Sequence, residues 1–481
     1  MCATIIVETQ GGFFYEVIKM TDTTENIMGT LPIGKLLMKM SVPVILSMLV
    51  STLYGVIDSI FVSRLGDNAL TAMSLATPIS SLIACITVGF SVGMNAELSK
   101  KLGEGDLDGA NKAAGNGILV NWIVAGIFLI FGLFFVPMFY RLQTDNATIQ
   151  RIGTDYTSII CIFSFGVANQ VMFERMLVAT GRYLGSMFSL LTGTIVNLIL
   201  DPILIFGYLG VPEMGMKGAA IATVVAQFSA AAVAFGFNLK VNKEIHFHPG
   251  MLIPKADTMK QIWNVGFPAA IQQSISPTMI FGMNQILLGF TEAAPAVYVI
   301  YVRLQSIVLI PIWGLKNTVV SIISYNYGAG KRERILKTIR ICLIATVAIT
   351  LCGLLIFQLI PDTLLALFNA QGEVLAIGRV ALRIVSFVFP FSGLTLILGA
   401  FFQALGNSRK TLLTSVVQLV IMLTSAIILS KIGTVNTVWF AFVITEVLVT
   451  MLAVILMKSV NSETISRIPS NVVKPGLAAE M

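Results

Sequence analysis

The chain has 481 residues, of which 56% are hydrophobic and only 11% are charged. Soluble domains carry about a quarter charged residues, so this composition excludes a soluble globular protein and indicates an integral membrane protein. The net charge of +7 does not indicate nucleic-acid binding, because the basic residues lie in loops between apolar segments.

Twelve apolar segments follow one another along the chain. Each has the roughly 20 to 28 residues that let a helix cross a bilayer, and no polar stretch between them is long enough for a soluble domain. We therefore predict an all-α integral membrane protein with twelve transmembrane helices. The predicted spans are 36–63, 72–99, 115–139, 155–179, 186–208, 216–239, 262–290, 296–326, 336–359, 377–403, 410–430 and 434–457.

Lysine and arginine residues lie mainly on one side of the predicted membrane. The side that holds both termini has 22 of them, and the other side has six. Because basic residues accumulate in cytoplasmic loops, we expect both termini to be cytoplasmic in a multi-pass protein of the cell (plasma or inner) membrane. Residues 1–35 and 459–481 are the predicted cytoplasmic ends, and we expect Met20 to be the natural start because the preceding residues are atypical.

The chain repeats itself at a constant offset. A shift of 225 residues, without gaps, aligns prolines, serines and glycines across six helices. Six is an even number, so both copies cross the membrane in the same direction, and such parallel repeats hold substrate at their interface. We predict two six-helix lobes, 36–239 and 262–458, related by a pseudo-twofold axis and joined by a cytoplasmic linker, 240–261. The aligned pairs are Pro43 with Pro268, Ser51 with Ser276, Gly89 with Gly314, Gly103 with Gly328, Gly105 with Gly330, Gly153 with Gly378 and Gly181 with Gly406.

The fifth predicted helix contains the most unusual residues for an apolar segment. Asn197 and Asp201 lie four residues apart, which places both side chains on one helix face. Pro202 follows directly and, inside a helix, leaves the carbonyl of Leu198 without its usual donor. A carboxylate is costly in hydrocarbon, so Asp201 must face protein or water, and we expect this segment to bind a cation or a proton.

Six stretches of the sequence carry distinctive motifs. They are YGVIDSIFVSRLGDNALTAMSLATPI (54–79), KKLGEGDLDGANKAAG (100–115), TGRYLGSMFSLLTGTIVNLILDPILIFG (180–207), GMKGAAIATVVAQ (215–227), NYGAGKRER (326–334) and QALGNSRKT (403–411). Together they resemble the multidrug and toxic compound extrusion (MATE) family, and the resemblance covers nearly the whole chain. It implies a twelve-helix, two-lobe exporter that exchanges sodium or protons for organic, often cationic, compounds.

In one branch of that family the ion site uses an acid in helix 1, an Asn-x-x-x-Asp pair in helix 5 and a threonine in helix 6. Matched by motif, the resemblance implies Asp58, Asn197, Asp201 and Thr223 as the residues that couple transport to H⁺ or Na⁺. No metal is expected beyond a Na⁺ ion at Asp58, Asn197 and Asp201, and no cofactor. Pro202 is the predicted hinge.

Three of these residues are predicted to lie at the same depth in the membrane. Each lies six residues from the residue that marks the outer end of its helix. At about 1.5 Å per residue, all three lie about 9 Å inside the outer boundary, as a shared site requires. The pairs are Asp58 with Arg64, Asp201 with Gly207 and Thr223 with Lys217.

The second repeat lacks these polar ligands. The equivalent positions hold Met283, Met422, Ala426 and Leu448, all of them apolar. We therefore predict that the ion site belongs to the N-terminal lobe alone.

Structural roles are the alternatives for these residues. Asn197 and Asp201 could cap the kink at the following proline, and Asp58 could pair with a nearby arginine. Thr223 could donate to a carbonyl of its own helix, as threonine often does.

Other polar residues lie at membrane depth, where such groups usually face a bundle interior or a cavity. Some are expected to contact substrate, with helix–helix hydrogen bonding as the alternative, and Arg383 and Glu446 could form a structural ion pair. The residues predicted to line the substrate cavity are Gln170, Gln272, Asn284 and Arg303.

These features together predict a secondary active antiporter for multidrug efflux, a xenobiotic transporter that confers antibiotic resistance. We do not expect an enzyme, because the sequence has no activated nucleophile, metal cluster or nucleotide motif. The expected partners are organic cations, the coupling ion and membrane lipid, without nucleic acid, and we expect a monomer. A lipid-linked oligosaccharide flippase of a related family is the alternative. Such a flippase should have more basic residues in its central cavity and often two further helices.

Overall fold

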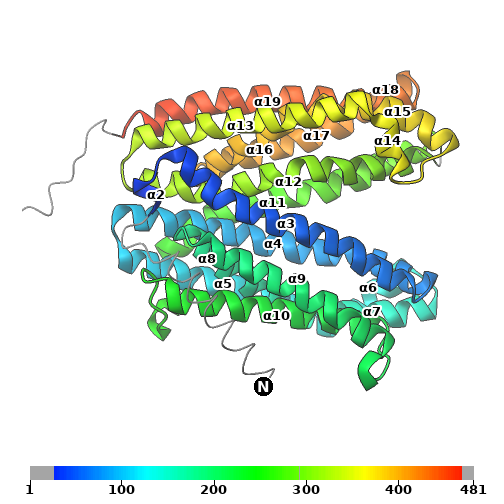
Figure 1. Cartoon of the computed structure of the whole chain (residues 1–481), viewed down its shortest axis with the longest axis horizontal. Helices are drawn as coiled ribbons and strands as arrows, with labels where there is room; N and C mark the ends of the chain where they lie inside the picture. The colour runs from blue at the N-terminus through cyan, green and yellow to red at the C-terminus, as the bar shows by residue number, and fades with distance from the viewer. Residues whose placement is uncertain (1–26, 292, 469–481) are drawn as a thin grey trace, which may run out of the picture.

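The computed structural model describes residues 27–291 and 293–468. The predicted start at Met20 and most of the predicted C-terminal tail lie outside these residues. Within them, every regular element is a helix, as the prediction of an all-α membrane protein required. Figure 1 shows the N-terminal helices in the lower half of the view and the C-terminal helices in the upper half, as two lobes lying side by side.

The long helices begin and end near the predicted spans. Those of the N-terminal lobe are α3 (Ile33–Ser63), α4 (Asp67–Glu104), α5 (Leu107–Phe134), α7 (Ala147–Ile162) with α8 (Phe165–Ala179), α9 (Tyr183–Phe206) and α10 (Met216–Val241). Those of the C-terminal lobe are α11 (Ala256–Leu288), α12 (Ala293–Gly328), α13 (Arg332–Leu359), α15 (Gly372–Ser386) with α16 (Val388–Ala404), α17 (Ser408–Ile432) and α19 (Phe440–Val460). Short helices are α2 (Ile27–Thr30), α6 (Val136–Gln143), η1 (Tyr208–Gly210), η2 (Pro249–Leu252), α14 (Pro361–Ala366), α18 (Val435–Val438) and η3 (Asn461–Ile465).

Nine described helices are long and apolar enough to span a membrane, and two bent pairs raise this number to 11. The remaining span is α11, whose 33 residues exceed the roughly 20 that a crossing needs although several of them are polar. The twelve predicted segments are therefore all helical. The prediction did not include the bends of 42° between α7 and α8 and 46° between α15 and α16. Both bends fall in the fourth segment of their lobe, so the repeat includes them.

The two lobes meet where α4 packs against α11 and α12. A Cβ atom on Gly103 would lie 1.9 Å from the carbonyl oxygen of Tyr325, and one on Gly328 would lie 2.0 Å from that of Lys100. Gly103 and Gly328 are equivalent in the 225-residue repeat, so the repeat places a glycine on each side of this crossing. Small residues of this kind let helix backbones approach closely in a membrane.

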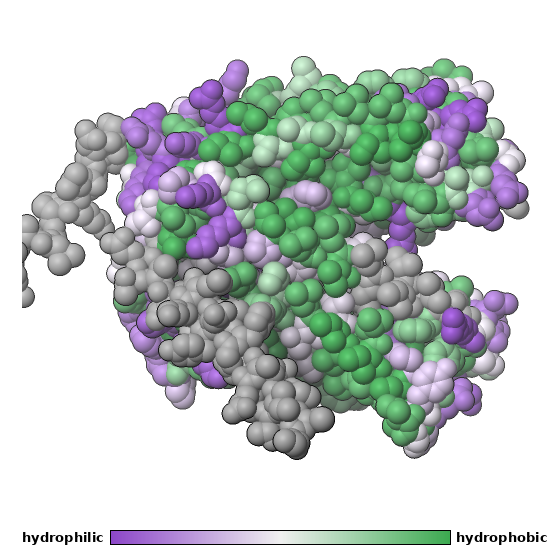
Figure 2. Space-filling model, viewed as in Figure 1, coloured by the Kyte–Doolittle hydropathy of each residue, from purple (hydrophilic) through white to green (hydrophobic). Residues whose placement is uncertain are grey.

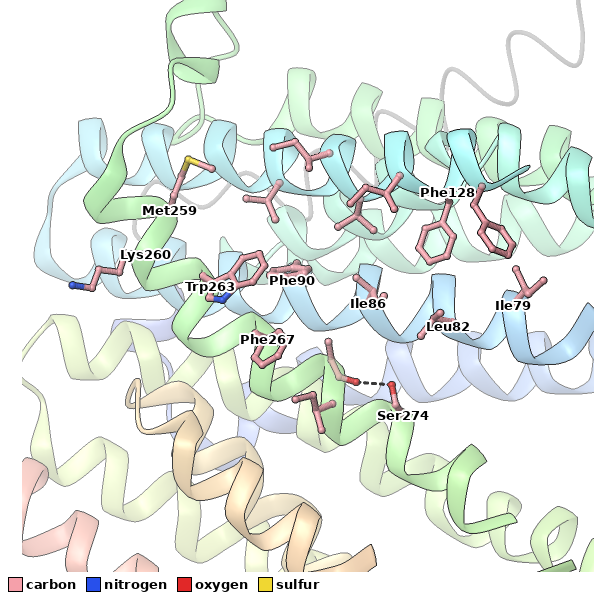
Figure 3. A pocket seen from close by; sticks show the side chains of 17 residues that line it. Ile79, Leu82, Ile86, Phe90, Phe128, Met259, Lys260, Trp263, Phe267 and Ser274 are labelled. Atoms are coloured by element: carbon pink, nitrogen blue, oxygen red, sulfur yellow. Dashed lines mark hydrogen bonds between the residues drawn. The ribbon is translucent and has the colours of Figure 1, made fainter. Parts of the chain in front are cut away.

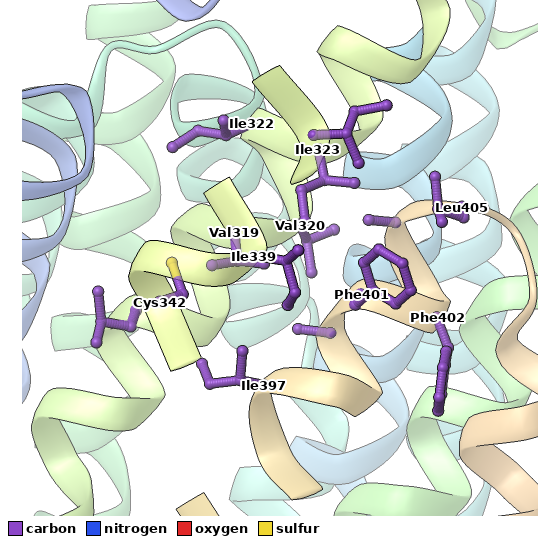
Figure 4. Packing of buried hydrophobic residues seen from close by; sticks show 14 of the residues in the cluster. Val319, Val320, Ile322, Ile323, Ile339, Cys342, Ile397, Phe401, Phe402 and Leu405 are labelled. Atoms are coloured by element: carbon purple, nitrogen blue, oxygen red, sulfur yellow. The ribbon is translucent and has the colours of Figure 1, made fainter. Parts of the chain in front are cut away.

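Both ends of the described chain lie at the same end of the molecule. Met28, near one end, and Ile465, near the other, belong to one hydrophobic cluster. Figure 4 shows part of this cluster, with Val320 and Ile323 of α12 facing Phe401 of α16. At the opposite end, Figure 2 shows the molecule hollowed between the lobes, and much of its outer surface is apolar, as contact with lipid requires. The lobes are therefore packed together at one end and separated at the other.

The close crossing of α4 and α12 predicts a strong effect of Gly103→Ala. The added methyl group has no room against the Tyr325 backbone, so the helices must separate, at a cost of about 1–3 kcal/mol. Thermal unfolding of the purified protein in detergent should occur at a clearly lower temperature. Gly126→Ala in α5 is the matched control, because no atom lies within 4 Å of its added Cβ. Equal unfolding temperatures for the two variants would contradict this packing argument.

Candidate functional site

The predicted ion-site residues of the N-terminal lobe lie on helices that pack together. Asp58 belongs to α3, Asn197 and Asp201 belong to α9, and Thr223 belongs to α10. Helix α9 packs against both α3 and α10. The fold thus gives all four residues a common neighbourhood, although they are up to 165 residues apart in sequence.

The two acids contact one another. The amide of Asn197 donates to Asp201 Oδ1 at 2.8 Å, and the Asp58 carboxyl hydrogen-bonds to the Asp201 carboxyl. Asp201 is fully buried and Asn197 nearly so. Ionised carboxylates only accept hydrogen bonds, so a bond between two carboxyl groups requires a proton on one of them. This arrangement can therefore hold a proton and, once that proton leaves, two adjacent negative charges.

Asp58 has a second feature that suits a ligand site. Its Oδ1 atom is buried and has no hydrogen-bond partner in the part of the chain that the structure describes. The alternative pairing of Asp58 with Arg64 is absent among the described ion pairs, and Arg64 is exposed. Burial of an unpaired carboxylate oxygen is unfavourable unless a proton or cation accompanies it.

Tyr156 of α7 is a neighbour that sequence reasoning missed. It is buried, and it lies close enough to both Asp58 and Asp201 to interact with them electrostatically. Helix α7 also packs against α10, so a third helix borders the acid pair. The available signal was a tyrosine at membrane depth at the start of the predicted span 155–179.

Thr223 lies on α10, which packs against α9, and Pro202 directly follows Asp201 in α9. Thr223 Oγ1 is half-buried and donates to the Ala219 carbonyl of its own helix at 3.0 Å, which is the arrangement named above as its structural alternative. Pro202 lies inside α9. Because proline has no N–H, the carbonyl of Leu198 has no donor one turn later, so a bare oxygen lies one residue from Asn197.

Three of the four equivalent positions of the C-terminal lobe lie in an apolar core. Met283, Met422 and Ala426 are almost completely buried within one hydrophobic cluster, whereas Leu448 is 46% exposed. The same helical frame therefore converges on side chains without charge or oxygen ligands in the second lobe. At equivalent positions of the same helices, the N-terminal lobe therefore carries polar side chains and the C-terminal lobe carries apolar ones.

A central cavity of about 520 Å³ lies between the lobes. The N-terminal lobe contributes few side chains to it, among them Met48 and Arg175, and helices α11, α12, α16, α17 and α19 contribute the rest. Of the predicted lining residues, Gln272 faces this cavity, and its Oε1 accepts from Lys316 at 3.2 Å and from Gln403 at 2.9 Å. The repeat interface thus contains a polar, partly charged cavity.

The other three predicted lining residues lie elsewhere. Gln170 donates to Glu174 at 3.2 Å, the buried side-chain oxygen of Asn284 has no partner among the residues that the structure describes, and Arg303 is exposed. None of the three is among the residues that line the central cavity. Hydropathy reveals the depth of a residue but not the face of the helix on which it lies, so the sequence alone could not separate these residues from Gln272.

Glu446 is the acid of this cavity. It is buried, its Oε1 accepts from Gln418 at 2.5 Å, and its Oε2 has no partner among the described residues. Arg383 is exposed and its carbonyl accepts from Gln358, so no Arg383–Glu446 ion pair forms in the described structure. The aromatic side chains Tyr298, Tyr301 and Phe442 line the same part of the cavity.

A larger groove of about 920 Å³ runs between α4, α5 and α11. Figure 3 shows Phe90, Trp263 and Phe267 along it, with Lys260 at one end. Ile127 and Trp263 are more than half exposed, which places the groove on the outside of the helix bundle. Its walls are almost entirely apolar, so it lacks the groups that could bind an ion or orient a polar compound.

Comparison with known proteins supports the architecture. The protein-family model described as MatE matches residues 43–203 and 268–428. The two matches begin 225 residues apart, which is the offset of the internal repeat. The chain thus carries the same family unit in each lobe.

Several named transporters and export proteins are similar over most of the chain. A probable multidrug resistance protein NorM from Thermotoga maritima is 23% identical over 80% of this chain and 83% of its own length. An FAD transporter from Shewanella oneidensis is 24% identical over 82% of this chain and 87% of its own. A multidrug export protein MepA from Staphylococcus haemolyticus is 23% identical over 89% of this chain and 94% of its own.

Solved structures share the fold. The outward-facing conformation of a multidrug resistance MATE family transporter of the MOP superfamily superposes with a TM-score of 0.86 at 22% identity. The superposition covers 92% of this chain and 99% of the other. The prediction of two repeated helical lobes is confirmed.

The hydrogen bond between the two acids predicts a protonated carboxyl group that depends on both. Infrared difference spectra recorded across a pH titration should contain a carboxylic-acid band that disappears in both Asp58→Asn and Asp201→Asn, because either change removes the shared proton. The exposed acid Asp67 provides the control, and Asp67→Asn should keep the band. A band that persists in both buried variants would show that these acids do not share a proton.

Proposed function

Because the chain belongs to the MatE family, we propose that it is a secondary active antiporter that exports organic, mostly cationic compounds in exchange for H⁺ or Na⁺. The observation that carries this proposal is the contact between Asp58 and Asp201 inside the N-terminal lobe. Both acids lie at membrane depth, and none of the ion pairs among the described residues joins Asp58 to a basic side chain, so the proposal takes a proton or a cation as the species that neutralises the pair.

The acid pair can exchange either ion. A proton is held by the bond between the two carboxyl groups. A Na⁺ ion, which prefers hard oxygen ligands, would find carboxylate oxygens of Asp58 and Asp201, the Asn197 amide oxygen and the free Leu198 carbonyl within one region of α3 and α9. Ion binding therefore changes the charge of a buried site next to Pro202.

We infer that Pro202 is the hinge of the coupling step. The carbonyl that the proline leaves free can find a new partner when α9 bends. The straight and bent arrangements of the helix then leave a similar number of backbone groups without hydrogen bonds. A ligand shifts such an equilibrium only by its difference in affinity for the two states. Export by antiport requires that the ion and the exported compound favour opposite states of the lobes.

The central cavity supports a cationic substrate through Glu446. An unpaired carboxylate oxygen is buried there beside the aromatic rings of Tyr298, Tyr301 and Phe442. Organic cations are bound by such a combination, because the carboxylate supplies opposite charge and the ring faces attract a cation. Since the basic residues are concentrated on the side of the termini, we propose that both termini are cytoplasmic and that export is directed to the opposite side.

The alternative of a lipid-linked oligosaccharide flippase has one observation in its favour. This observation is that Arg175 and Lys316 both line the central cavity. Against the flippase, the described residues form twelve spans and not the two further helices expected for many such proteins. A resistance assay in a pump-deficient host separates the two functions. Protection against a cationic dye supports the exporter, and no protection against any cationic dye favours the flippase.

The coupling role of the acids predicts the behaviour of Asp201→Asn and Asp58→Asn in vesicles. In wild-type protein, an imposed pH or Na⁺ gradient should drive export of an ethidium-like dye. Either variant should lower gradient-driven export by about tenfold or more, a factor within the range that typical coupling free energies produce. The exposed-site variant Asp67→Asn should match the wild type. Export by Asp201→Asn at wild-type coupling would refute the assigned role.

The cavity acid predicts a separate effect of Glu446→Gln. This change preserves the shape of the side chain and its contact with Gln418 but removes the negative charge. Binding of a cationic dye to the purified protein should weaken by about tenfold or more, because a desolvated opposite charge is lost. Glu463→Gln is the control, since the Glu463 side chain is 57% exposed and pairs with Lys410. Equal dye affinity in the two variants would remove Glu446 from the substrate site.

A further inference from the structure

Two basic side chains from opposite lobes face the central cavity. Arg175 comes from α8 of the N-terminal lobe and Lys316 from α12 of the C-terminal lobe. Arg175 is one of the 22 basic residues predicted to lie on the side of the termini, and Lys316 was predicted only to lie at membrane depth. The structure places both on the wall of one cavity.

These two cations have little compensation from the protein. The ammonium group of Lys316 donates to Gln272 Oε1 at 3.2 Å, and that neutral oxygen is shared with Gln403. The Arg175 guanidinium makes no hydrogen bond to an acceptor in the described parts of the chain. Arg175 and Lys316 lie close enough for their like charges to repel, so each makes the other less stable.

One acid lies near this pair, but it is already engaged. Glu174, the sequence neighbour of Arg175, interacts with it electrostatically. Its Oε1 accepts from the Ser189 hydroxyl at 2.8 Å and from the Gln170 amide at 3.2 Å, contacts that hold the carboxylate within the N-terminal lobe. Two positive charges and one negative charge leave this end of the cavity positive.

We propose that Arg175 and Lys316 bind the anionic group, a carboxylate or a phosphate, of a transported compound between the two lobes. An anion placed there gains charge-assisted hydrogen bonds from both side chains and relieves their mutual repulsion. Guanidinium groups bind carboxylate and phosphate through paired parallel hydrogen bonds, and the lysine supplies a second charge from the opposite side. The inference deepens the proposed function, on which it rests, by adding compounds with an anionic group to the exported class.

A matched pair of ligands tests this assignment directly. The probes are a rhodamine with a free carboxylate and its methyl ester, which share a fluorophore and differ in one negative charge. Their affinities for the full-length protein in nanodiscs of neutral phosphatidylcholine are measured by fluorescence anisotropy. Wild-type protein should bind the free acid more tightly than the ester. In Lys316→Gln and in Arg175→Gln this preference should fall by about tenfold, because each change removes a hydrogen bond to a charged group.

The control variant is Lys431→Gln, which removes a positive charge from an exposed position at the end of α17 and should keep the wild-type preference. Size-exclusion profiles and unfolding temperatures establish that the variants are folded. An unchanged preference for the acid in both folded cavity variants would overturn the assignment. A second measurement uses nanodiscs that contain anionic phosphatidylglycerol, whose phosphate could occupy the same site. If this lipid abolished the binding of the acid but not of the ester, the site would bind a lipid phosphate. That result would also overturn the assignment to a transported compound.

The outcomes of this experiment are separable from those of the proposed function. Binding preference is measured at equilibrium without an ion gradient, whereas antiport is measured in vesicles with one. Loss of gradient-driven export with an intact acid preference would refute antiport and keep the anion site. Gradient-driven export together with no preference for the acid would keep antiport and refute the anion site.

Discussion

The close crossing of α4 with α12 is the constraint on which the rest of the structure depends. Gly103 and Gly328 allow the two backbones to touch at the end of the molecule that carries both chain ends, while the opposite end is hollowed between the lobes (Figure 2). A cavity between lobes can change its accessible side only if the contacts at one end can be exchanged for contacts at the other. The glycine crossing gives the closed end a close backbone contact that depends on the shape of the two helices.

The repeat and the acid pair together explain how one architecture can hold two different chemistries. Duplication placed Met422 and Ala426 at the positions that Asn197 and Asp201 occupy in the first lobe, and these apolar side chains are buried in a continuous core. A buried carboxyl group needs a neutralising partner, whereas a buried methionine needs only contact. The positions of the second lobe that correspond to the acid pair therefore carry no such energetic demand, and the buried acid of that lobe, Glu446, lies elsewhere, in the central cavity. In the proposed mechanism, the two lobes share the same arrangement of helices but only the N-terminal lobe carries the acid pair, so the ion and the substrate bind at separate places.

The sequence alone could predict the spans, the repeat and the helices that bring Asp58 to Asp201, because each depends on periodicity, length or depth. It could not predict the bend in the fourth segment of the first lobe, since no proline or charge marks the break at Phe163, whereas in the second lobe Pro390 follows the break at Phe387. It also missed Tyr156 and misplaced Arg175. Hydropathy averages over a window and loses the direction in which each side chain points, and that direction decides whether a polar group faces a cavity, a neighbouring helix or lipid. The partners of a buried acid are a property of packing, which appears only once the helices are assembled.

The charges of the central cavity occupy different parts of it. Tyr301, which interacts electrostatically with Glu446, and Lys316 both belong to α12 and are fifteen residues apart, or about 22 Å along the helix axis. The residue that interacts with the acid and the basic residue therefore lie several turns apart on α12, and a charge–charge interaction weakens with separation. In the two proposals above, an organic cation binds at the aromatic end of the cavity and an anionic group binds where the two lobes meet. Compounds of opposite charge would then bind to different side chains of the same cavity, because the two proposed sites lie at different points along α12.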